Sequence, residues 1–277
     1  MSKPVLLIED FSALGQISMI GALSVLQAMG ITTAALPATV LSSQTEGFGQ
    51  PAVLDTEQWI DNALRHWQDQ AIKPAGILIG YLGQRTLADL LDKWVQQNDQ
   101  DSFFKMIDPV IGDQGKLYPG FDQDYVQSIR KLCHHADLIT PNWTELCLLT
   151  NQPICKPTAE AIKQGIACLR SQQITADVIV TGVRVNNQVG CCFLQDHELR
   201  FYGNSIQPGH FYGTGDVFAA LLYGRLLQHW PLDAAISNSI KAMEQAIQQT
   251  APLADSERRF GLRLDHLIQF VIRHNRE

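Results

Sequence analysis

The chain has 277 residues, of which 45% are hydrophobic and 18% are charged, and its formal net charge at pH 7 is −7. These values are typical of a soluble globular protein with a large core, and the acidic balance argues against a nucleic-acid-binding surface. No stretch of eighteen apolar residues occurs, and residues 1–8 have no long apolar run, so neither membrane insertion nor export is indicated. The six cysteines form no C-x-x-C pair, which favours free thiols in a reducing cytoplasm.

Short β-rich segments alternate with longer helical patterns along the whole chain. Such alternation is typical of the α/β class, in which helices cover both faces of a mostly parallel sheet. The sequence shows no repeat, low-complexity tract or linker, so we expect a single domain over residues 1–277. The expected strands span 5–8, 33–36, 76–79, 103–107, 138–140, 178–181, 189–194 and 198–202. The expected helices span 18–29, 56–70, 84–97, 124–134, a short stretch after Pro141, 158–171, 213–228, 232–250 and 262–274.

Single residues decide some details of this assignment. Pro37 lacks a backbone N–H and is expected to interrupt the second strand region. Asp55 is expected to cap the helix that follows it, with Gln58 in the capping-box position. Trp59 belongs to the apolar positions of that helix and is expected to point inward. Cys191 and Cys192 are neighbours in a strand pattern and should face opposite sides of the sheet.

In an open parallel sheet, ligands bind beyond the carboxyl ends of the strands. The residues that directly follow the expected strands are therefore candidate site residues, and we expect them to meet at one edge of the sheet. They are Asp10, Tyr81, Asp108, Asn142 and Gly182.

The run Gly213-Thr214-Gly215-Asp216 precedes apolar residues at helical spacing, which predicts a tight turn opening into a buried helix. The N–H groups of a first helical turn and the helix dipole attract anions, and glycine lets a phosphate approach the backbone. We expect the same field to keep Asp216 ionised, so that it could accept a hydroxyl proton during phosphoryl transfer. The alternative is that Asp216 only caps the helix after a glycine-rich turn.

Two further carboxylates follow expected strands. Asp108 could hold Mg²⁺ against phosphate oxygens, and the alternative is a turn aspartate before proline. Glu145 lies in the first turn of a short helix and would aim at the same edge, whereas Asn142 could be a plain cap. The segment 112–116 lacks the Gly-x-x-x-x-Gly-Lys-Ser/Thr spacing of a P-loop, so we expect a mobile loop there.

Four motifs, taken in order, resemble a known family. They are Asp108-Pro109-Val110-x-Gly112, Thr140-Pro141-Asn142-x-x-Glu145, Val178-Ile179-Val180-Thr181-Gly182 and Gly213-Thr214-Gly215-Asp216. Over nearly its whole length the chain is similar to the ribokinase-like vitamin kinases, and residues 10–15, 41–49 and 80–83 resemble the pyridoxal and pyridoxamine kinase branch. The resemblance implies a ribokinase-like fold and ATP-dependent phosphorylation of the 5′-hydroxymethyl group of pyridoxal, pyridoxamine or pyridoxine.

The resemblance also implies roles for individual positions. Asp216 would be the catalytic base beside the substrate hydroxyl, with the backbone of Gly213, Thr214 and Gly215 binding the transferring phosphate. The segments that hold Mg²⁺, a monovalent cation such as K⁺ and the ATP phosphates match Asp108, Asn142 and Glu145, with Asp108 and Glu145 as metal ligands. The position near ATP matches Thr181, and the loop over ATP matches residues 112–120. The positions that line the pyridine pocket match Asp10, Thr45, Glu46 and Tyr81.

The chain departs from the family pattern near the substrate pocket. Many pyridoxal kinases carry Gln-Ser-His where this chain has Glu9-Asp10-Phe11, and Gly-Asn-Ser near Ser18-Met19-Ile20, and Gln is common at position 46. Two acids in the pocket, Asp10 and Glu46, would favour a substrate that carries positive charge. The alternative is that one of them is a helix or turn cap that points away.

The rival functions are a hydroxymethylpyrimidine kinase of thiamine synthesis and a catalytically silent ligand-binding protein on the same fold. The regions around Asp10 and Thr45 favour vitamin B6, and the presence of Asp216, Asp108 and Glu145 speaks against a silent protein. The resembled family further implies a cytoplasmic homodimer that binds small molecules.

Overall fold

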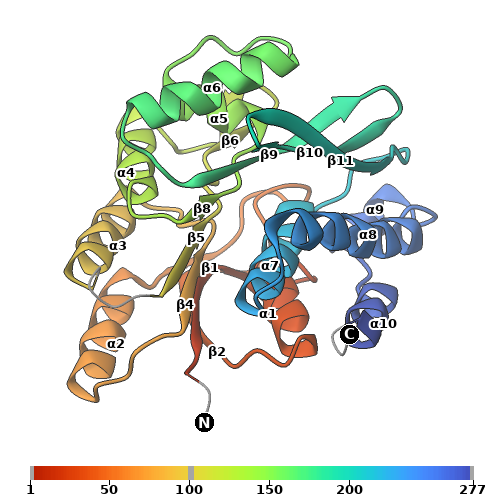
Figure 1. Cartoon of the computed structure of the whole chain (residues 1–277). Helices are drawn as coiled ribbons and strands as arrows, with labels where there is room; N and C mark the ends of the chain where they lie inside the picture. Colours follow the sequence, from red (N-terminus) through yellow and green to blue (C-terminus); the bar gives the residue numbers. More distant parts are fainter. Residues whose placement is uncertain (1–2, 99–102, 275–277) are drawn as a thin grey trace.

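The computed structural model describes residues 3–98 and 103–274. Within these residues one nine-stranded sheet crosses the molecule in the order β11-β10-β9-β8-β5-β4-β1-β2-β3 (Figure 1). Neighbouring strands run parallel from β9 to β2, and the pairs at the two ends run antiparallel. The strands are β1 (Val5–Ser12), β2 (Thr33–Leu41), β3 (Val53–Asp55), β4 (Gly76–Ile79), β5 (Phe104–Ile107), β8 (Leu138–Ile139), β9 (Asp177–Val185), β10 (Gln188–Gln195) and β11 (Glu198–Ser205).

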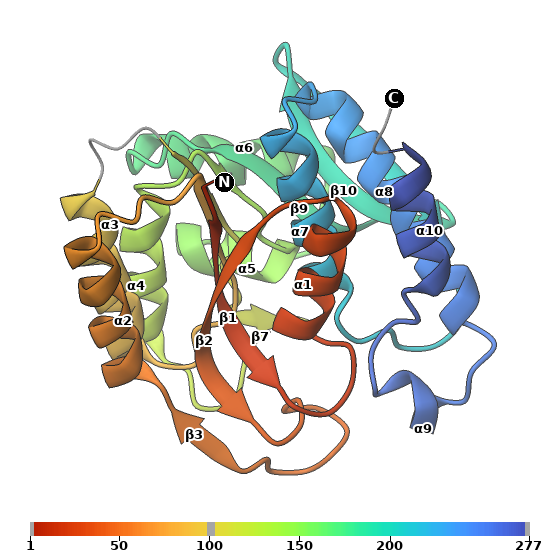
Figure 2. The same cartoon turned by 90° about the horizontal axis from the view of Figure 1, so that it is seen from below.

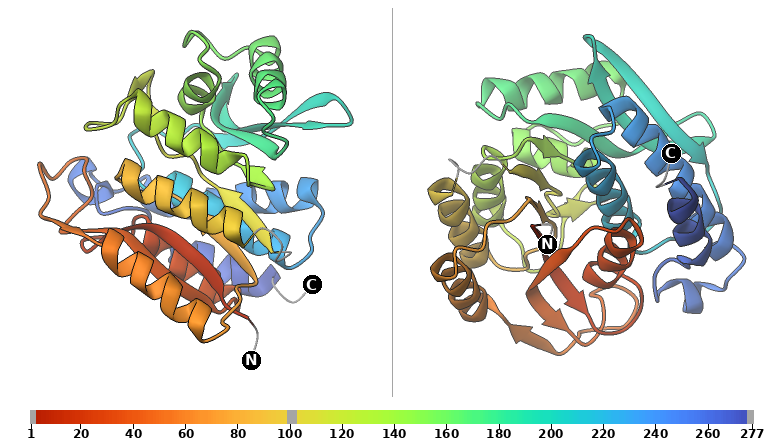
Figure 3. Two further views of the ribbon diagram at one scale, coloured as in Figure 1. Left: turned by 90° about the vertical axis from the view of Figure 1, so that its left-hand side faces the viewer. Right: turned by 60° about the horizontal axis from the view of Figure 1, so that its bottom comes forward.

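Helices cover both faces of the sheet, as Figure 3 shows from two further sides. One face is covered by α2 (Glu57–Asp69), α3 (Arg85–Gln97), α4 (Gln123–Cys133), α5 (Trp143–Thr150) and α6 (Ala159–Ser171). The other face is covered by α1 (Met19–Ala28), α7 (Thr214–Leu227), α8 (Leu232–Thr250) and α10 (Asp265–His274), and the short α9 (Asp255–Arg258) joins α8 to α10. This arrangement confirms the α/β class that the sequence predicts.

The central strands are apolar on both sides because both sides are covered. In β1, Leu6 and Ile8 belong to the buried cluster under α2 to α6, whereas Val5 and Leu7 belong to the cluster under α1 and α7. Successive strand residues point to opposite faces, so a strand between two helical layers is a continuous apolar run. The same alternation places Cys191 and Cys192 in different clusters, as expected. All six cysteines are free.

Two strands extend beyond the sequence-based bounds. A break was expected at Pro37, but β2 continues through it, because β3 joins β2 only at Thr39–Leu41 and leaves one side of position 37 unpaired. Proline is tolerated in a strand that is paired on one side only. β1 continues to Ser12 through a register shift between Glu9 and Phe11. Asp10 therefore lies inside a strand rather than after it.

The start of α2 also differs from the expectation. The N-cap is Thr56, and Asp55 instead accepts a hydrogen bond of 2.9 Å from the amide of Glu57. The side chain of Gln58 donates to a residue one turn further on, so the expected capping box does not form. Trp59 is 51% exposed, because neighbouring positions of the helix take the buried face.

A short hairpin stands where a mobile loop was expected. The strands β6 (Gly112–Asp113) and β7 (Lys116–Leu117) pair antiparallel. The hairpin is held against the start of α5, because Asn142 Nδ2 donates to the carbonyl of Gly112 at 2.8 Å and the Gly115 amide donates to Thr144 Oγ1 at 2.9 Å. The residues 112–117 are therefore fixed beside the carboxyl ends of the central strands. In the described part of the chain, no helix combines the length and apolar character needed to span a membrane.

Candidate active site

A cavity of about 240 Å³ lies at the carboxyl ends of the parallel strands, where the α/β architecture places ligands. Twelve of the site residues expected from the sequence line it. These residues are Asp10, Thr45, Glu46, Tyr81, Asp108, Asn142, Glu145, Thr181, Gly213, Thr214, Gly215 and Asp216. Gly182 is not among the lining residues, although its neighbour Thr181 in β9 is.

The glycine-rich motif forms the start of α7. Gly213 is the N-cap and has a φ of 76°, a left-handed conformation that glycine adopts without strain. Asp216 is the third residue of the helix and does not cap it, so the simple capping alternative is not what the structure shows. Its Oδ2 accepts a hydrogen bond of 2.9 Å from the amide of Ser18, just before α1. Two helix N-termini therefore meet at this carboxylate.

The carboxylate of Asp216 lies in a buried place as well as at a helix N-terminus. Burial raises the pKa of Asp216 above its ordinary value, and the hydrogen bonds from Ser18 oppose part of that rise. Removing a carboxylate from water disfavours its charged form, and here this effect is larger than that of the hydrogen bonds. A raised pKa nevertheless suits a proton acceptor, because the conjugate acid becomes more stable.

Other carboxyl groups around the cavity are shifted in the same direction. Burial, followed by the charge of Asp216, raises the pKa of Asp108 to about 7 and that of Asp10 to about 6. The pKa of Glu9 is also raised well above its ordinary value by burial and by these three neighbours. The cavity wall thus concentrates negative charge in a poorly solvated place. A cation, either a metal ion or part of a ligand, would relieve this repulsion.

Asn142 and Glu145 form a capping box at the start of α5. Asn142 Oδ1 accepts from the Glu145 amide at 3.0 Å, and Glu145 Oε2 accepts from the Asn142 amide at 2.7 Å. Glu145 Oε1 accepts from the amide of Ile111 at 3.1 Å. Asn142 is therefore a cap, as one alternative held, and both oxygens of Glu145 already bind backbone amides while the residue lines the cavity.

The donor set suits a hard cation such as Mg²⁺. Asp108 Oδ1 accepts from Thr140 Oγ1 at 3.0 Å, and Oδ2 lies 3.8 Å from the point where a Cβ on Gly215 would stand. No cluster of three or more His, Cys, Asp or Glu side chains forms a complete metal cage in the described ranges. Mg²⁺ seldom needs one, since it is usually held by one or two carboxylates together with waters and substrate phosphates. Asp108, and Glu145 behind it, fit that pattern.

An aromatic stack supports another wall. Tyr81 lines the cavity and packs against Phe121 with ring centroids 5.5 Å apart, and Phe121 stacks on Tyr125 at 3.9 Å. Burial, followed by the charge of Asp10, raises the pKa of Tyr81 to about 12. Tyr81 therefore stays neutral near pH 7 and offers a flat face with a hydroxyl group, which suits an aromatic ligand.

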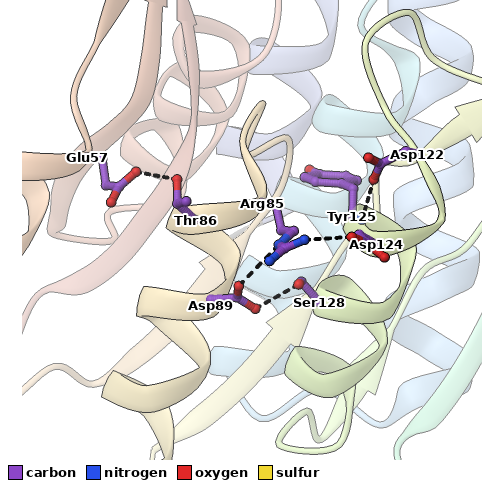
Figure 4. A network of polar contacts seen from close by, with 8 residues as sticks. All are labelled: Glu57, Arg85, Thr86, Asp89, Asp122, Asp124, Tyr125 and Ser128. Atoms are coloured by element: carbon purple, nitrogen blue, oxygen red, sulfur yellow. Dashed lines mark hydrogen bonds and ion pairs between the residues drawn. The ribbon is translucent and has the colours of Figure 1, made fainter.

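Polar contacts fix the helices behind this stack (Figure 4). Arg85 of α3 pairs with Asp124 of α4 at 2.7 Å, and Ser128 Oγ donates to Asp89 Oδ1 at 2.7 Å. Asp122 caps α4 by accepting from the amide of Tyr125 at 2.9 Å. The pairs are partly exposed and individually weak, but together they tie α3 to α4 at the end that faces the cavity.

One part of the cavity wall was not expected from the sequence. His210, Phe211 and Tyr212 line it immediately before Gly213, and His210 Nε2 lies 3.6 Å from Glu46 Oε2 at the rim. The sequence signal that could have identified these three residues is their position directly before the glycine-rich motif. Further lining residues, to which the sequence analysis gave no individual role, are Ile17, Ser18, Leu41, Gln44, Val110, Asp113 and Tyr118. The last two belong to the segment 112–120, which the resemblance assigned to the loop over ATP.

The chain is similar to known proteins over most of its length. Residues 21–259 match the family described as phosphomethylpyrimidine kinase. A pyridoxine/pyridoxal/pyridoxamine kinase of Bordetella avium is 29% identical over 213 residues, which cover 72% of this chain and 68% of that protein. Another curated relative, from Schizosaccharomyces pombe, is matched over 48% of its own length.

Two solved structures share the whole fold. Pyridoxal kinase from Lactobacillus plantarum is 35% identical, with a TM-score of 0.92 over 99% of this chain and 98% of that one. A Bacteroides thetaiotaomicron structure with pyridoxal is 28% identical, with a TM-score of 0.87 over 100% and 96% of the two chains.

Proposed function

Since this chain is a kinase of the phosphomethylpyrimidine kinase family, we propose that it transfers the γ-phosphoryl group of ATP to the 5′-hydroxymethyl group of a vitamin B6 compound. The observation that carries the proposal is the position of Asp216. This carboxylate stands in the first turn of α7, on the same cavity as the Gly213–Gly215 turn and Asp108. Similarity to the Lactobacillus plantarum and Bordetella avium kinases supports the choice of substrate class.

The proposed step is an in-line displacement. The substrate hydroxyl oxygen forms a bond to the γ-phosphorus while the bond from that phosphorus to the bridging oxygen breaks, which releases ADP. Asp216 accepts the hydroxyl proton, and its raised pKa favours this role. The amides at the start of α7 donate to the oxygens of the transferring group, where negative charge gathers.

Asp108, with Glu145 behind it, would hold Mg²⁺, which supplies positive charge between the carboxylates and the phosphate oxygens. Asn142 and Thr181 lie on the same wall and are joined by a backbone bridge. We assign this wall to the nucleotide phosphates. The hairpin β6–β7, through Asp113, and Tyr118 border the same side of the cavity.

The substrate side of the proposal comprises Asp10, Thr45, Glu46 and Tyr81. Asp10 and Glu46 both line the cavity, and neither is a helix cap. Asp10 is buried, and its Oδ2 accepts from Ser12 Oγ at 2.8 Å. Two acids beside the ring-binding wall favour a vitamer with positive charge, such as pyridoxamine with its 4′-ammonium group.

A second candidate is the phosphorylation of a pyrimidine such as hydroxymethylpyrimidine, because the matched family is described as phosphomethylpyrimidine kinase. A coupled assay of ADP release separates the two. It should be run with pyridoxal, pyridoxamine, pyridoxine and hydroxymethylpyrimidine at equal concentrations. We expect turnover with at least one B6 compound and a lower kcat/KM for the pyrimidine. Turnover of the pyrimidine alone would reverse the assignment, and ADP release with none of the four would refute both.

A further inference from the structure

The segment Arg258–Gly261 begins at the last residue of α9 and lies outside the set of residues that line the cavity. The segment nevertheless contacts three loops that surround the cavity. Figure 2 shows α9 at the end of the molecule toward which β1 and β2 point. The first of these loops is residues 42–50, which carry Thr45 and Glu46. The other two are residues 13–18, which lead to Ser18, and residues 206–213, which carry His210.

The contact with loop 42–50 is made mainly by Arg259. Its Nη1 donates to the carbonyl of Gly47 at 3.0 Å, and its guanidinium lies 4.4 Å from the centre of the Phe48 ring. Phe48 in turn meets Phe260 edge to face at 5.1 Å. The backbone carbonyl of Arg259 accepts a hydrogen bond from Gln44 Nε2. The two residues that line the cavity, Thr45 and Glu46, thus sit between two anchored positions.

The contact with loop 13–18 is made by the backbone. The amide of Gln16 donates to the carbonyl of Phe260 at 2.7 Å, and Gln16 forms an isolated parallel bridge with Gly261. The two chains approach so closely that a Cβ on Gly15 would stand 2.5 Å from the Phe260 oxygen. Ser18, whose amide donates to Asp216, lies two residues after Gln16.

The contact with loop 206–213 is made by Arg258, whose guanidinium lies 5.6 Å from the Phe211 ring and packs against Gly209. Arg258 is buried and also donates to the carbonyls of Ala251 at 3.1 Å and Leu253 at 2.7 Å. Those bonds close the local turn after α8. Arg258 is therefore buried in local contacts of its own turn, whereas Arg259 is only partly buried and reaches across to another loop.

We propose that Arg259 is a positioning residue for the substrate pocket, which fixes loop 42–50 so that Thr45 and Glu46 face the vitamer. This inference rests on the proposed function, since it assigns the loop to the substrate rather than to ATP. The nucleotide wall, built from Asp108, Asn142 and Thr181, lies on other elements. Loss of Arg259 should therefore weaken substrate binding and leave nucleotide binding and the chemical step unchanged.

The experiment compares Arg259→Ala and Arg259→Lys with Arg263→Ala. Arg263 is an exposed arginine two residues beyond this segment and lies outside the contacts described above. Steady-state kinetics should give a KM for the vitamer raised about three- to tenfold in Arg259→Ala, with kcat and the KM for ATP within about twofold of wild type. Arg259→Lys keeps the positive charge over Phe48 but not the planar guanidinium, so its KM for the vitamer should lie between those of wild type and Arg259→Ala. Arg263→Ala should match wild type.

A second measurement does not depend on activity. Hydrogen–deuterium exchange should show faster exchange of amides in residues 42–50 of Arg259→Ala and unchanged exchange in β5 and α7. If exchange in 42–50 does not change, Arg259 does not fix the loop and the proposal is overturned. If exchange rises but the KM for the vitamer stays at the wild-type value, the loop is fixed but does not serve the substrate, and the proposal is again overturned. If wild type phosphorylates no B6 vitamer, the proposed function fails, and faster exchange alone supports the role of Arg259 in holding the loop.

Discussion

The amide of Ser18 donates a 2.9 Å hydrogen bond to the carboxylate of Asp216, although 198 positions separate the two residues in the chain. The bond joins the start of α1 to the first turn of α7 and orients one carboxylate oxygen. Asp216 also lines the cavity, where we propose that it meets the substrate hydroxyl. The geometry therefore allows removal of the base with little change to the surrounding structure.

Asp216→Asn is expected to lower kcat by about 10²–10⁴-fold, the usual contribution of a positioned base. The Asn side-chain oxygen can still accept from the Ser18 amide, so the fold and the affinity for ATP should change little. Turnover assays measure kcat, single-turnover phosphorylation measures the chemical step, and calorimetry measures the affinity for ATP. Near-wild-type turnover would show that Asp216 is not the base.

The two glycines of the motif should respond differently to alanine. Gly213 has a φ of 76°, where alanine is strained, so Gly213→Ala should lower stability by about 1 kcal/mol or more. A Cβ on Gly215 would have Asp108 Oδ2 at 3.8 Å as its close neighbour, which is an ordinary contact. Gly215→Ala should therefore fold normally and yet lower kcat by about 10²–10³-fold, if a phosphate must approach this backbone. Thermal unfolding and turnover should be measured together on both variants, because the first reports stability and the second reports the phosphate role. A fully active Gly215→Ala would refute the phosphate role.

Part of this site could be predicted because parallel strands end at one edge. Asp108 and Asn142 each follow a strand of the same sheet, so strand order alone brings them together. Thr45 and Glu46 came only from family resemblance, since their approach depends on contacts with Arg259, more than two hundred residues away. The pKa of Asp216 could not be predicted from its helix position, because burial among groups from several segments controls it. Pro37 and Trp59 were misjudged because the neighbours that a strand or helix acquires are not local information.

Glu9 provides a test of the electrostatic description. The side chain is 3% exposed, and its Oε1 has no hydrogen-bond partner within the described residues. Burial, followed by repulsion from Asp216, raises the pKa of Glu9 well above 4.5, so the folded protein retains a proton that the unfolded chain releases. The stability contributed by this group is present below pH 4.5 and is lost as the pH rises toward the folded-state pKa.

Glu9→Gln removes the titrating group, and with it the loss of stability at higher pH, while keeping the shape of the side chain. The free energy of unfolding of the variant, relative to wild type, should rise with pH above about 5, by about 1.4 kcal/mol per pH unit at most. Urea denaturation in metal-free buffer at several pH values between 5 and 8 measures it. A difference that is the same at every pH would show that Glu9 does not carry a raised pKa.

The acids of the substrate wall predict which vitamer is preferred. Asp10 and Glu46 both line the cavity, and a hydrogen bond to a charged group contributes about 1.5–3 kcal/mol, which is about ten- to a hundredfold in kcat/KM. Wild type should therefore prefer pyridoxamine to pyridoxal, and Asp10→Ser or Glu46→Gln should reduce the ratio of the two kcat/KM values.

Because the pKa of Asp10 is raised to about 6, the carboxylate gains its charge as the pH rises through that value. The preference should accordingly increase between pH 5 and 7 in wild type and lose this increase in Asp10→Ser. Measured kcat/KM values for both vitamers across that range test the idea, and a preference for pyridoxal that neither substitution alters would show that these acids do not select the substrate.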